Sequence, residues 1–506
     1  MDVQRRTLLA IILCVAIWAV FDLITPKPPP AKPDADNVEV AADMDEEDGS
    51  DRDRGEKPSD PPSDSGASEA PTAAAETHVI RNDYLALELT NGSGMLRSAS
   101  MLSEQFLDDE GKGLDIYGLD GASTLELAFG ERSDFRIPRR ANWEVVKGEG
   151  NKRFKLRYVS DEVEVIRDIE LGDLYEGRLR VKVINRSGKP QAHQFGLVNR
   201  LGEPQEKSQY DIHRGLCATS EDVEEAELDD LEDGPQRTRG GIQWLGLDSK
   251  YFLAAIVPDK AMRVCEVEAS DDASMIVGSL RGKDIELEPG ESKVYEFGLY
   301  FGIKELSYLE NYEAIPGVGL ERAIDWGWFG SLSSGLGKQM LRLLRWFYSL
   351  TGIWGVAILM LTVVVKLVML PLTLKQMKSM RRMKEIQPKM AEIKEKYADD
   401  RMRQGQEMQA LFAREGVNPL AGCLPLVLQM PIWFALYAML AAAVELYRVP
   451  FLWLPDLTQQ DPYYILPLAM GGLMFLQTRL QPSVGDNQQA KMMMWMMPIM
   501  FTFMML

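Results

Sequence analysis

Apolar and polar positions follow three different patterns along the chain. Residues 7–25 form one apolar run, residues 78–315 alternate apolar and polar side chains in short segments, and residues 336–506 carry long apolar stretches. Runs of about 20 apolar residues predict membrane helices, whereas alternation predicts half-buried strands. The pattern predicts a multi-domain membrane protein with an N-terminal anchor helix, an all-β domain and a C-terminal helical membrane bundle.

The first apolar run has the form of a secretory signal, because Arg5 and Arg6 precede it. No small-x-small cleavage site follows promptly, and about 19 apolar residues suffice to span a bilayer. We therefore predict an uncleaved signal anchor over residues 1–25, with its N-terminus in the cytoplasm. Residues 26–77 are rich in Pro, Ala and acidic side chains. They can bury too little apolar surface to offset the entropy lost on ordering, so we predict a disordered linker.

The alternating segments predict short strands separated by turn sequences such as Pro289-Gly290. The clearest of them cover residues 84–89, 163–166, 179–184 and 294–301. Many short strands at this spacing are typical of a β-sandwich, so residues 78–315 are predicted to form a periplasmic β-sandwich domain. His78, His193 and His213 lie in this domain without a recognisable catalytic triad around them, which favours a binding or structural role.

The C-terminal part predicts a membrane domain over residues 351–506. Before it, residues 336–347 place an apolar face beside basic side chains, which predicts an interfacial helix within a connecting region at 316–350. Spans are predicted at 354–372, 420–444 and 465–480, and the basic segment 375–418 is predicted to be a cytoplasmic helical hairpin. The last apolar segment, from Met492, is short for a span, so the final helix looks truncated.

Charge and cysteine content refine this organisation. Residues 26–330 hold 36 Lys and Arg against 63 Asp and Glu, whereas residues 331–506 hold 18 against 11. The acidic exported part argues against a nucleic-acid partner. Cys217 and Cys265 share that part, where disulfides form, and their spacing fits no metal motif. The sequence alone does not decide between a disulfide and two free thiols, and free thiols are the default expectation.

Lys366 is the unusual residue of the first predicted span in the membrane domain. It lies nine residues before Lys375, the start of the basic segment. At a rise of about 1.5 Å per residue, Lys366 therefore lies about 13–14 Å from the cytoplasmic boundary. A charge buried in lipid there would cost roughly 2.5–3.5 kcal/mol, and neither 354–372 nor 420–444 contains an acidic residue. We predict a water-filled recess, open to the cytoplasm and lined by Lys366, Thr362 and Gln429. The alternative is a lysine that snorkels to the interface or pairs structurally.

Several motifs resemble the bacterial YidC-type membrane protein insertases. They are VVKLVMLPLT at 364–373, NPLAGCLP at 418–425, QMPI at 429–432, DPYYILP at 461–467, and the segments 240–258 and 325–328. The resemblance implies a periplasmic β-supersandwich, an interfacial helix, a cytoplasmic hairpin and a five-helix core with a hydrophilic groove. The family's groove cation is most often arginine, whereas this chain has Lys366, which lacks the bidentate fork of arginine.

The resemblance implies an insertase and chaperone that inserts and helps fold proteins in the bacterial inner membrane, alone or with the Sec translocon. The implied partners are nascent membrane proteins, the Sec translocon with its accessory subunits, the ribosome and membrane lipids. The substrate would slide along Met430, Pro431, Ile432 and Phe434. The chain is not expected to be an enzyme, and no catalytic residue, cofactor or metal site is predicted.

Three other functions make different demands on the sequence. An intramembrane protease would need a Ser–His pair or paired carboxylates within the spans, and Glu445 stands alone at a helix end. A secondary transporter usually shows internal repeats, which are absent here, although prolines within the spans keep this alternative open. A structural scaffold of the envelope also stays open. It predicts that deleting most of residues 78–315 abolishes function, whereas the insertase hypothesis predicts tolerance.

Overall fold

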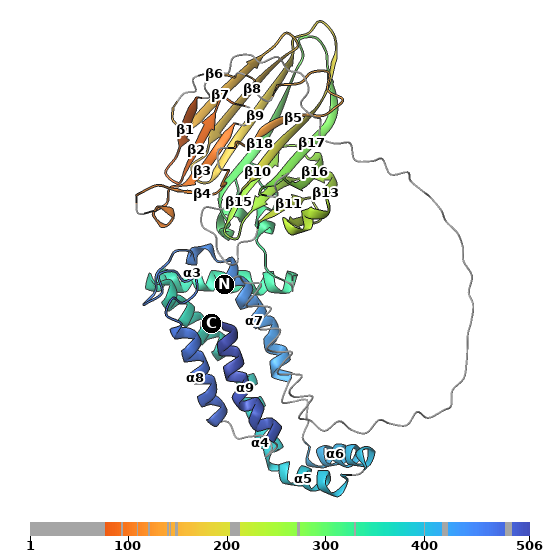
Figure 1. Cartoon of the computed structure of the whole chain (residues 1–506), viewed down its shortest axis with the longest axis vertical. Helices are drawn as coiled ribbons and strands as arrows, with labels where there is room; N and C mark the ends of the chain where they lie inside the picture. Colours follow the sequence, from red (N-terminus) through yellow and green to blue (C-terminus); the bar gives the residue numbers. More distant parts are fainter. Residues whose placement is uncertain are drawn as a thin grey trace, which may run out of the picture. The chain divides into compact units, whose positions relative to one another are not determined.

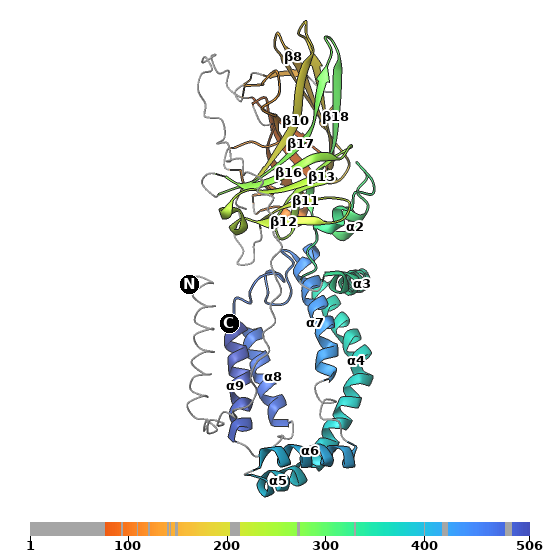
Figure 2. The same ribbon diagram turned by 90° about the vertical axis from the view of Figure 1, so that its right-hand side faces the viewer.

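The computed structural model describes residues 76–505 with short internal gaps. The gaps are at 93–94, 109, 120–121, 139–140, 142, 147–149, 203–212, 271–273, 328–329, 399, 417–423 and 481–487. The anchor predicted at 1–25 and all but the last two residues of the predicted linker lie outside the described residues. The structural account therefore concerns the β-domain and the helices that follow it (Figures 1 and 2).

Three antiparallel sheets make up the described β-domain. The nine-stranded sheet has the order β12 (Val223–Glu227), β11 (Arg214–Ala218), β14 (Trp244–Asp248), β15 (Phe252–Pro258), β18 (Ser292–Ile303), β9 (Glu176–Asn185), β8 (Val163–Leu171), β7 (Arg153–Val159) and β6 (Glu144–Val146). The five-stranded sheet runs β13 (Gln236–Ile242), β16 (Met262–Ala269), β17 (Ile276–Leu287), β10 (Gln191–Leu201) and β5 (Glu126–Phe129). The four-stranded sheet runs β1 (Thr77–Arg81), β2 (Leu85–Thr90), β3 (Leu96–Met101) and β4 (Leu114–Asp115).

The strands follow the alternation of the sequence. In β9, Leu179 and Val181 are buried while Arg178 and Arg180 are exposed, because successive side chains of a strand point to opposite faces. The alternating segments at 84–89, 163–166, 179–184 and 294–301 fall within or across β2, β8, β9 and β18. The all-β prediction for this part of the chain is confirmed.

The core lies where the five- and nine-stranded sheets face each other. The ring of Phe195 on β10 stacks on that of Tyr295 on β18, with centroids 4.1 Å apart. Beside them His193 is only 1% exposed, and its Nε2 lies 2.8 Å from the Tyr295 hydroxyl. Burial, with a smaller contribution from Lys293, lowers the pKa of His193 to about 4. His193 is thus a neutral core residue, as the structural interpretation of the sequence expected.

This buried histidine makes the domain sensitive to acid. The unfolded chain, with a histidine pKa of about 6.5, binds more protons than the folded chain between pH 6.5 and 4, so stability falls as pH falls. From pH 7 to pH 5, His193 should lower the unfolding free energy by about 2 kcal/mol. Urea unfolding of the purified protein in detergent, read by pulse proteolysis of the β-domain, measures this loss. His193→Gln keeps a polar partner for Tyr295 without titrating, so an unchanged pH slope in that variant would contradict the assignment.

The structure joins Cys217 on β11 to Cys265 on β16 by a disulfide. The default expectation of free thiols is therefore wrong. The sequence could not show that these two strands, from different sheets, face each other across the core. A disulfide across a sequence separation of 48 residues stabilises the fold by about 4 kcal/mol in the chain-entropy model.

A buried charge cluster lies at the ends of β11, β14 and β18. Asp248 is fully buried, and its carboxylate accepts hydrogen bonds from Lys304 Nζ at 2.8 Å and from Arg214 Nη2 at 2.9 Å. Arg214 also binds Glu225 at 2.5 Å and lies 3.7 Å from Asp325, in the segment that leads to the helices. Burial lowers the pKa of Lys304, and the Asp248 carboxylate opposes this shift. Asp248 is therefore the shared counter-ion of two buried cations, Arg214 and Lys304.

The described helices follow the β-domain in sequence. They are α2 (Leu306–Glu310), α3 (Gly330–Thr351), α4 (Trp354–Glu385), α5 (Gln387–Lys396), α6 (Arg401–Glu415), α7 (Leu424–Ala442), α8 (Ile465–Leu480) and α9 (Gln488–Met505). Short 3₁₀ turns lie among them at Leu320–Ala323 and Val444–Leu446, and within the β-domain at Glu104–Phe106 and Asp229–Asp233. α3 packs against α4 and α7, while α8 and α9 pack against each other (Figure 2). The predicted C-terminal helical region is confirmed.

The helix that carries Lys366 is longer than predicted. The sequence indicated a span ending near Leu372, but α4 continues to Glu385 with Pro371 inside it. Leu, Lys, Met and Arg follow Pro371, and these strong helix formers outweigh the single backbone hydrogen bond that proline cannot donate. The segment predicted as a hairpin therefore begins within α4 and contains α5 and α6. Ile386, between α4 and α5, and Leu411, in α6, are buried.

α3 shows the amphipathic character expected for residues 336–347. Leu341, Leu344 and Phe347 are buried, whereas Trp346 is more than half exposed. The basic edge contacts α2, because Lys338 Nζ and Arg342 Nη2 each lie 3.8 Å from the Glu310 carboxylate. Part of the basic edge that the sequence assigned to the membrane interface thus pairs within the protein.

Candidate groove on helices α4 and α7

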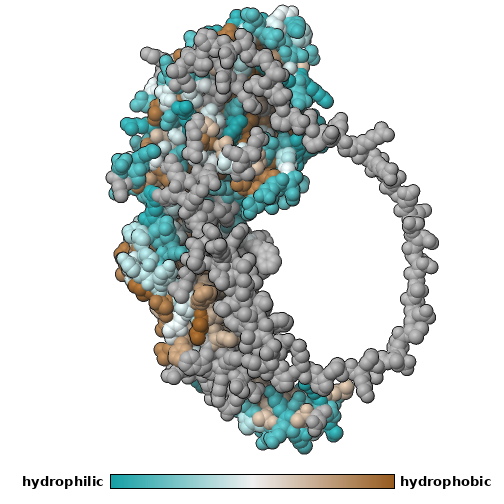
Figure 3. All heavy atoms as spheres, viewed as in Figure 1, coloured by the Kyte–Doolittle hydropathy of each residue, from teal (hydrophilic) through white to brown (hydrophobic). Residues whose placement is uncertain are grey.

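Two of the three predicted groove residues, Lys366 and Thr362, lie on α4, which is long and apolar enough to cross a membrane. Its segment Trp354–Leu374 has a mean hydropathy of 2.4, and only 17% of its most apolar window is buried within the protein. The core helix of a soluble protein would be mostly buried, so this low burial favours a membrane-facing helix. On the face shown in Figure 3, hydrophobic residues gather on the visible part of the helices above α5 and α6, whereas α5, α6 and most of the visible β-domain are hydrophilic.

Lys366 lies in the middle of this apolar segment. Its side chain is exposed, and its neighbours Val363 and Leu367 are 57% and 60% exposed. Within the described part of the chain, no acidic side chain lies at ion-pair distance from Lys366. The structural pairing that the sequence left as an alternative is therefore absent among the described residues.

Thr362 lies one helical turn before Lys366 and shares its face of α4. Its Oγ1 donates a 2.9 Å hydrogen bond to the Ile358 carbonyl, which satisfies the hydroxyl proton within the helix. The oxygen keeps a lone pair that can accept a further hydrogen bond. Lys366 and Thr362 together place a cation and an acceptor on one exposed face.

The other predicted groove residue, Gln429, lies on α7 near its N-terminal end and is exposed. α7 contacts α4 less extensively than it contacts α3. No hydrogen bond among the described residues joins Gln429 to Lys366 or Thr362. The backbone thus places the three polar side chains on two neighbouring helices, without a direct contact between them.

The predicted slide residues differ in their exposure. Met430 is 43% exposed, whereas Pro431, Ile432 and Phe434 are half-buried. Helical geometry instead places Met430, Trp433 and Tyr437 on one face, because they are three and four residues apart. Trp433 and Tyr437 are both more than half exposed, and their rings stack with centroids 6.4 Å apart. Neither Trp433 nor Tyr437 belongs to the predicted slide, although their spacing from Met430 in the sequence places them on its face of the helix.

Glu445, which the sequence left alone at a helix end, has a partner. Its carboxylate accepts a 2.7 Å hydrogen bond from Arg345 Nε on α3, and Arg345 Nη2 also lies 3.5 Å from Glu305. The pair ties α3 to the segment that follows α7. This role is structural, and the described residues contain no cluster of His, Cys, Asp and Glu that could hold a metal ion.

Family models match two parts of the chain. The model of the YidC periplasmic domain matches residues 77–338, and the model described as a 60 kDa inner membrane protein matches residues 346–506. The first match alone covers more than half of the chain. The chain belongs to the YidC family of membrane protein insertases. A family of insertases agrees with the prediction that the chain is not an enzyme.

Curated YidC-family relatives show the same similarity. The YidC insertase of Anaeromyxobacter dehalogenans strain 2CP-C is 41% identical over 58% of this chain and 53% of its own length. The insertase of Anaeromyxobacter sp. strain Fw109-5 is 34% identical over 83% of this chain and 78% of its own length. The chain therefore spans about half the length of the first of these relatives, and most of the second.

Solved structures give weaker similarities. A YidC insertase structure with its first transmembrane domain resolved covers 86% of this chain at 18% identity, with a TM-score of 0.34. A galactose mutarotase-like protein from Lactobacillus casei covers 45% of this chain at 12% identity, with a TM-score of 0.35. The family assignment rests on the sequence matches.

Proposed function

We propose that this chain inserts proteins into the bacterial inner membrane and helps them fold there. The observation that carries the proposal is Lys366, a cation in the middle of an apolar helix long enough to span a bilayer, with no acidic partner among the described residues. Such a charge is unfavourable in lipid, so a water-filled recess around it is the economical arrangement. Lys366, Thr362 and Gln429 line this recess, which opens to the cytoplasm.

The recess lowers the barrier for polar segments of an incoming protein. Lys366 attracts an acidic or polar segment, and Thr362 and Gln429 offer hydrogen bonds to its backbone. A polar segment that would otherwise enter hydrocarbon is therefore stabilised part-way across the bilayer. The step forms no covalent bond and uses no cofactor.

The apolar helix of the substrate then moves into lipid along α7. Met430, Pro431, Ile432 and Phe434 give it an apolar surface, which Trp433 and Tyr437 extend on the exposed face. Apolar residues are favoured in the hydrocarbon core, so partitioning drives the release of the substrate helix. Side chains with intermediate burial suit transient contacts better than a tightly packed interface would.

The surroundings of the site fit this function. The N-terminus and the basic hairpin 375–418 face the cytoplasm by the positive-inside rule, and the acidic β-domain faces the periplasm. Nascent membrane proteins and membrane lipids are the expected partners. The Sec translocon with its accessory subunits is a further expected partner, as is the ribosome, which would contact the basic hairpin.

A direct test uses the purified full chain in proteoliposomes. A radiolabelled single-span protein with an acidic N-terminal tail is synthesised in their presence, and protease protection reports insertion. We expect protection above the level of protein-free liposomes, without uptake of small solutes. Solute uptake without insertion would contradict the proposal and favour the transporter alternative.

A further inference from the structure

The edge strands of the two large sheets meet at one end of the sandwich. β12 is an edge of the nine-stranded sheet, and β13 is an edge of the five-stranded sheet. Cys217 on β11 pairs in register with Glu224 on β12, while Cys265 on β16 pairs with Thr238 on β13. The disulfide therefore joins the strands that lie immediately inside the two edges.

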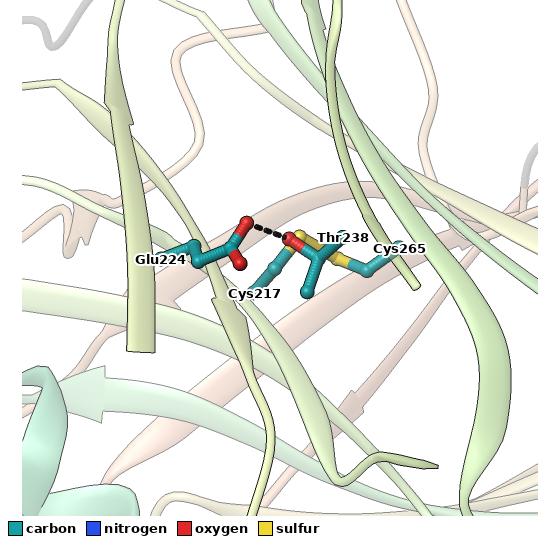
Figure 4. The surroundings of a disulfide bond; sticks show 4 residues. All are labelled: Cys217, Glu224, Thr238 and Cys265. Carbon is teal, nitrogen blue, oxygen red and sulfur yellow. Dashed lines mark hydrogen bonds between the residues drawn. A yellow bond between two sulfur atoms is a disulfide. The ribbon is translucent and has the colours of Figure 1, made fainter. Parts of the chain in front are cut away.

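A second link joins the edge strands themselves. Thr238 Oγ1 donates a 2.6 Å hydrogen bond to the Glu224 carboxylate, beside the disulfide (Figure 4). The disulfide thus joins β11 to β16, and the hydrogen bond joins their neighbours β12 and β13. β12 and β13 are also consecutive in the chain and are joined through the 3₁₀ turn Asp229–Asp233. The disulfide adds a second covalent link at this end of the sandwich, where open strand edges are templates for pairing with other chains.

The sheets approach each other closely here because β11 carries Gly215. A Cβ atom at this position would lie 2.3 Å from the Val267 side chain on β16. Gly215 and Val267 are each two residues from the cysteine of their own strand, so they lie next to the disulfide on the facing strands. The glycine allows the approach that brings the two cysteine Cα atoms to 5.9 Å.

The two sulfur atoms are out of reach once the domain is folded. Cys217 is 2% exposed and Cys265 is fully buried, so the disulfide has to form while the domain folds. The other two cysteines, Cys14 and Cys423, lie in predicted membrane segments. Only one pairing is therefore open to the exported thiols, and no wrong disulfide needs correction.

We propose that Cys217 and Cys265 are a substrate site for a protein thiol oxidase of the exported compartment. This oxidase forms the disulfide that joins the two sheets while the domain folds, and no disulfide isomerase is needed. One cysteine thiolate attacks the oxidase disulfide to form a mixed disulfide. The second cysteine thiolate then displaces the oxidase. In total the two thiols of this chain lose two protons and two electrons, and the oxidase leaves as a dithiol that has taken up both. The inference rests on the proposed periplasmic placement of the β-domain.

The test follows the redox state of the full chain with Cys14→Ala and Cys423→Ala, so that only the pair remains. Cells of a Gram-negative host are quenched with acid and labelled with a maleimide mass tag, with or without the host's periplasmic thiol oxidase or isomerase. We expect the pair to be oxidised in the wild-type host, oxidised roughly tenfold more slowly without the oxidase, and unaffected by loss of the isomerase. Unchanged oxidation without the oxidase would overturn the proposal, as would dependence on the isomerase.

Two further measurements keep the proposal separate from its assumptions. Thr238→Val removes the neighbouring hydrogen bond but no cysteine, so it should leave oxidation unchanged. Cys217→Ser with Cys265→Ser should make residues 219–242 at least about tenfold more sensitive to protease added to spheroplasts. A β-domain that external protease cannot reach would refute the periplasmic placement. A domain that is reached but keeps reduced thiols in the wild-type host would refute the oxidase proposal alone.

Discussion

Lys366→Glu should reduce the insertion of substrates with acidic translocated tails roughly tenfold or more. A unit charge pair about 8 Å apart contributes about 2 kcal/mol at an effective dielectric constant of 20, and reversing the charge replaces this attraction by repulsion. Expression of the variant as the sole insertase in a depletion strain, with protease mapping of the substrate tail, measures the effect. Wild-type insertion of acidic tails by this variant would contradict the electrostatic role.

Two controls separate charge from structure in this experiment. Lys366→Arg keeps the cation and should retain most of the insertion, although its planar fork differs from an ammonium group. Substrates with neutral tails should be far less sensitive to Lys366→Glu than substrates with acidic tails. An equal loss for both substrate classes would indicate that the variant has damaged the helix bundle.

Asp248→Ala should lower the unfolding free energy of the β-domain by about 3–5 kcal/mol, because it leaves two buried cations without their shared partner. Asp248 is fully buried, and both Arg214 and Lys304 lie within 3 Å of its carboxylate. Urea unfolding of the purified protein in detergent, followed by pulse proteolysis of the β-domain, gives the difference. An unchanged unfolding midpoint would show that the cluster is solvated.

Glu225→Ala is the matched control in the same cluster. Glu225 also binds Arg214, but its side chain is 46% exposed. Water screens this pair, so its loss should cost about 1 kcal/mol or less. The contrast between the two variants isolates the effect of burial from the effect of losing a carboxylate.

Much of the fold could be predicted because its signals are local. Alternation identified β2, β8, β9 and β18, since one face of each strand is buried and the other is not. Length and hydropathy identified α4, and the Ile465 start of α8 coincides with the predicted span. The helix ends were less certain, because the helix formers after Pro371 extend α4 beyond the apolar run.

Contacts between distant segments could not be predicted in this way. The pairing of Arg345 with Glu445 joins residues 100 positions apart, and nothing in either local sequence indicates it. The exposed face of α7 is an intermediate case. Spacing alone puts Trp433 and Tyr437 beside Met430, but only the packing of α7 against α3 shows which face stays open.

The sequence by itself determined the order of the domains, the strand and helix types and the presence of a lysine in an apolar span, because each depends on the periodicity and polarity of neighbouring residues. The tertiary structure decided that Cys217 meets Cys265, that Asp248 collects two cations, and that Lys366 has no acidic partner among the described residues. These facts depend on which strands and helices face each other, and a linear pattern carries no record of that.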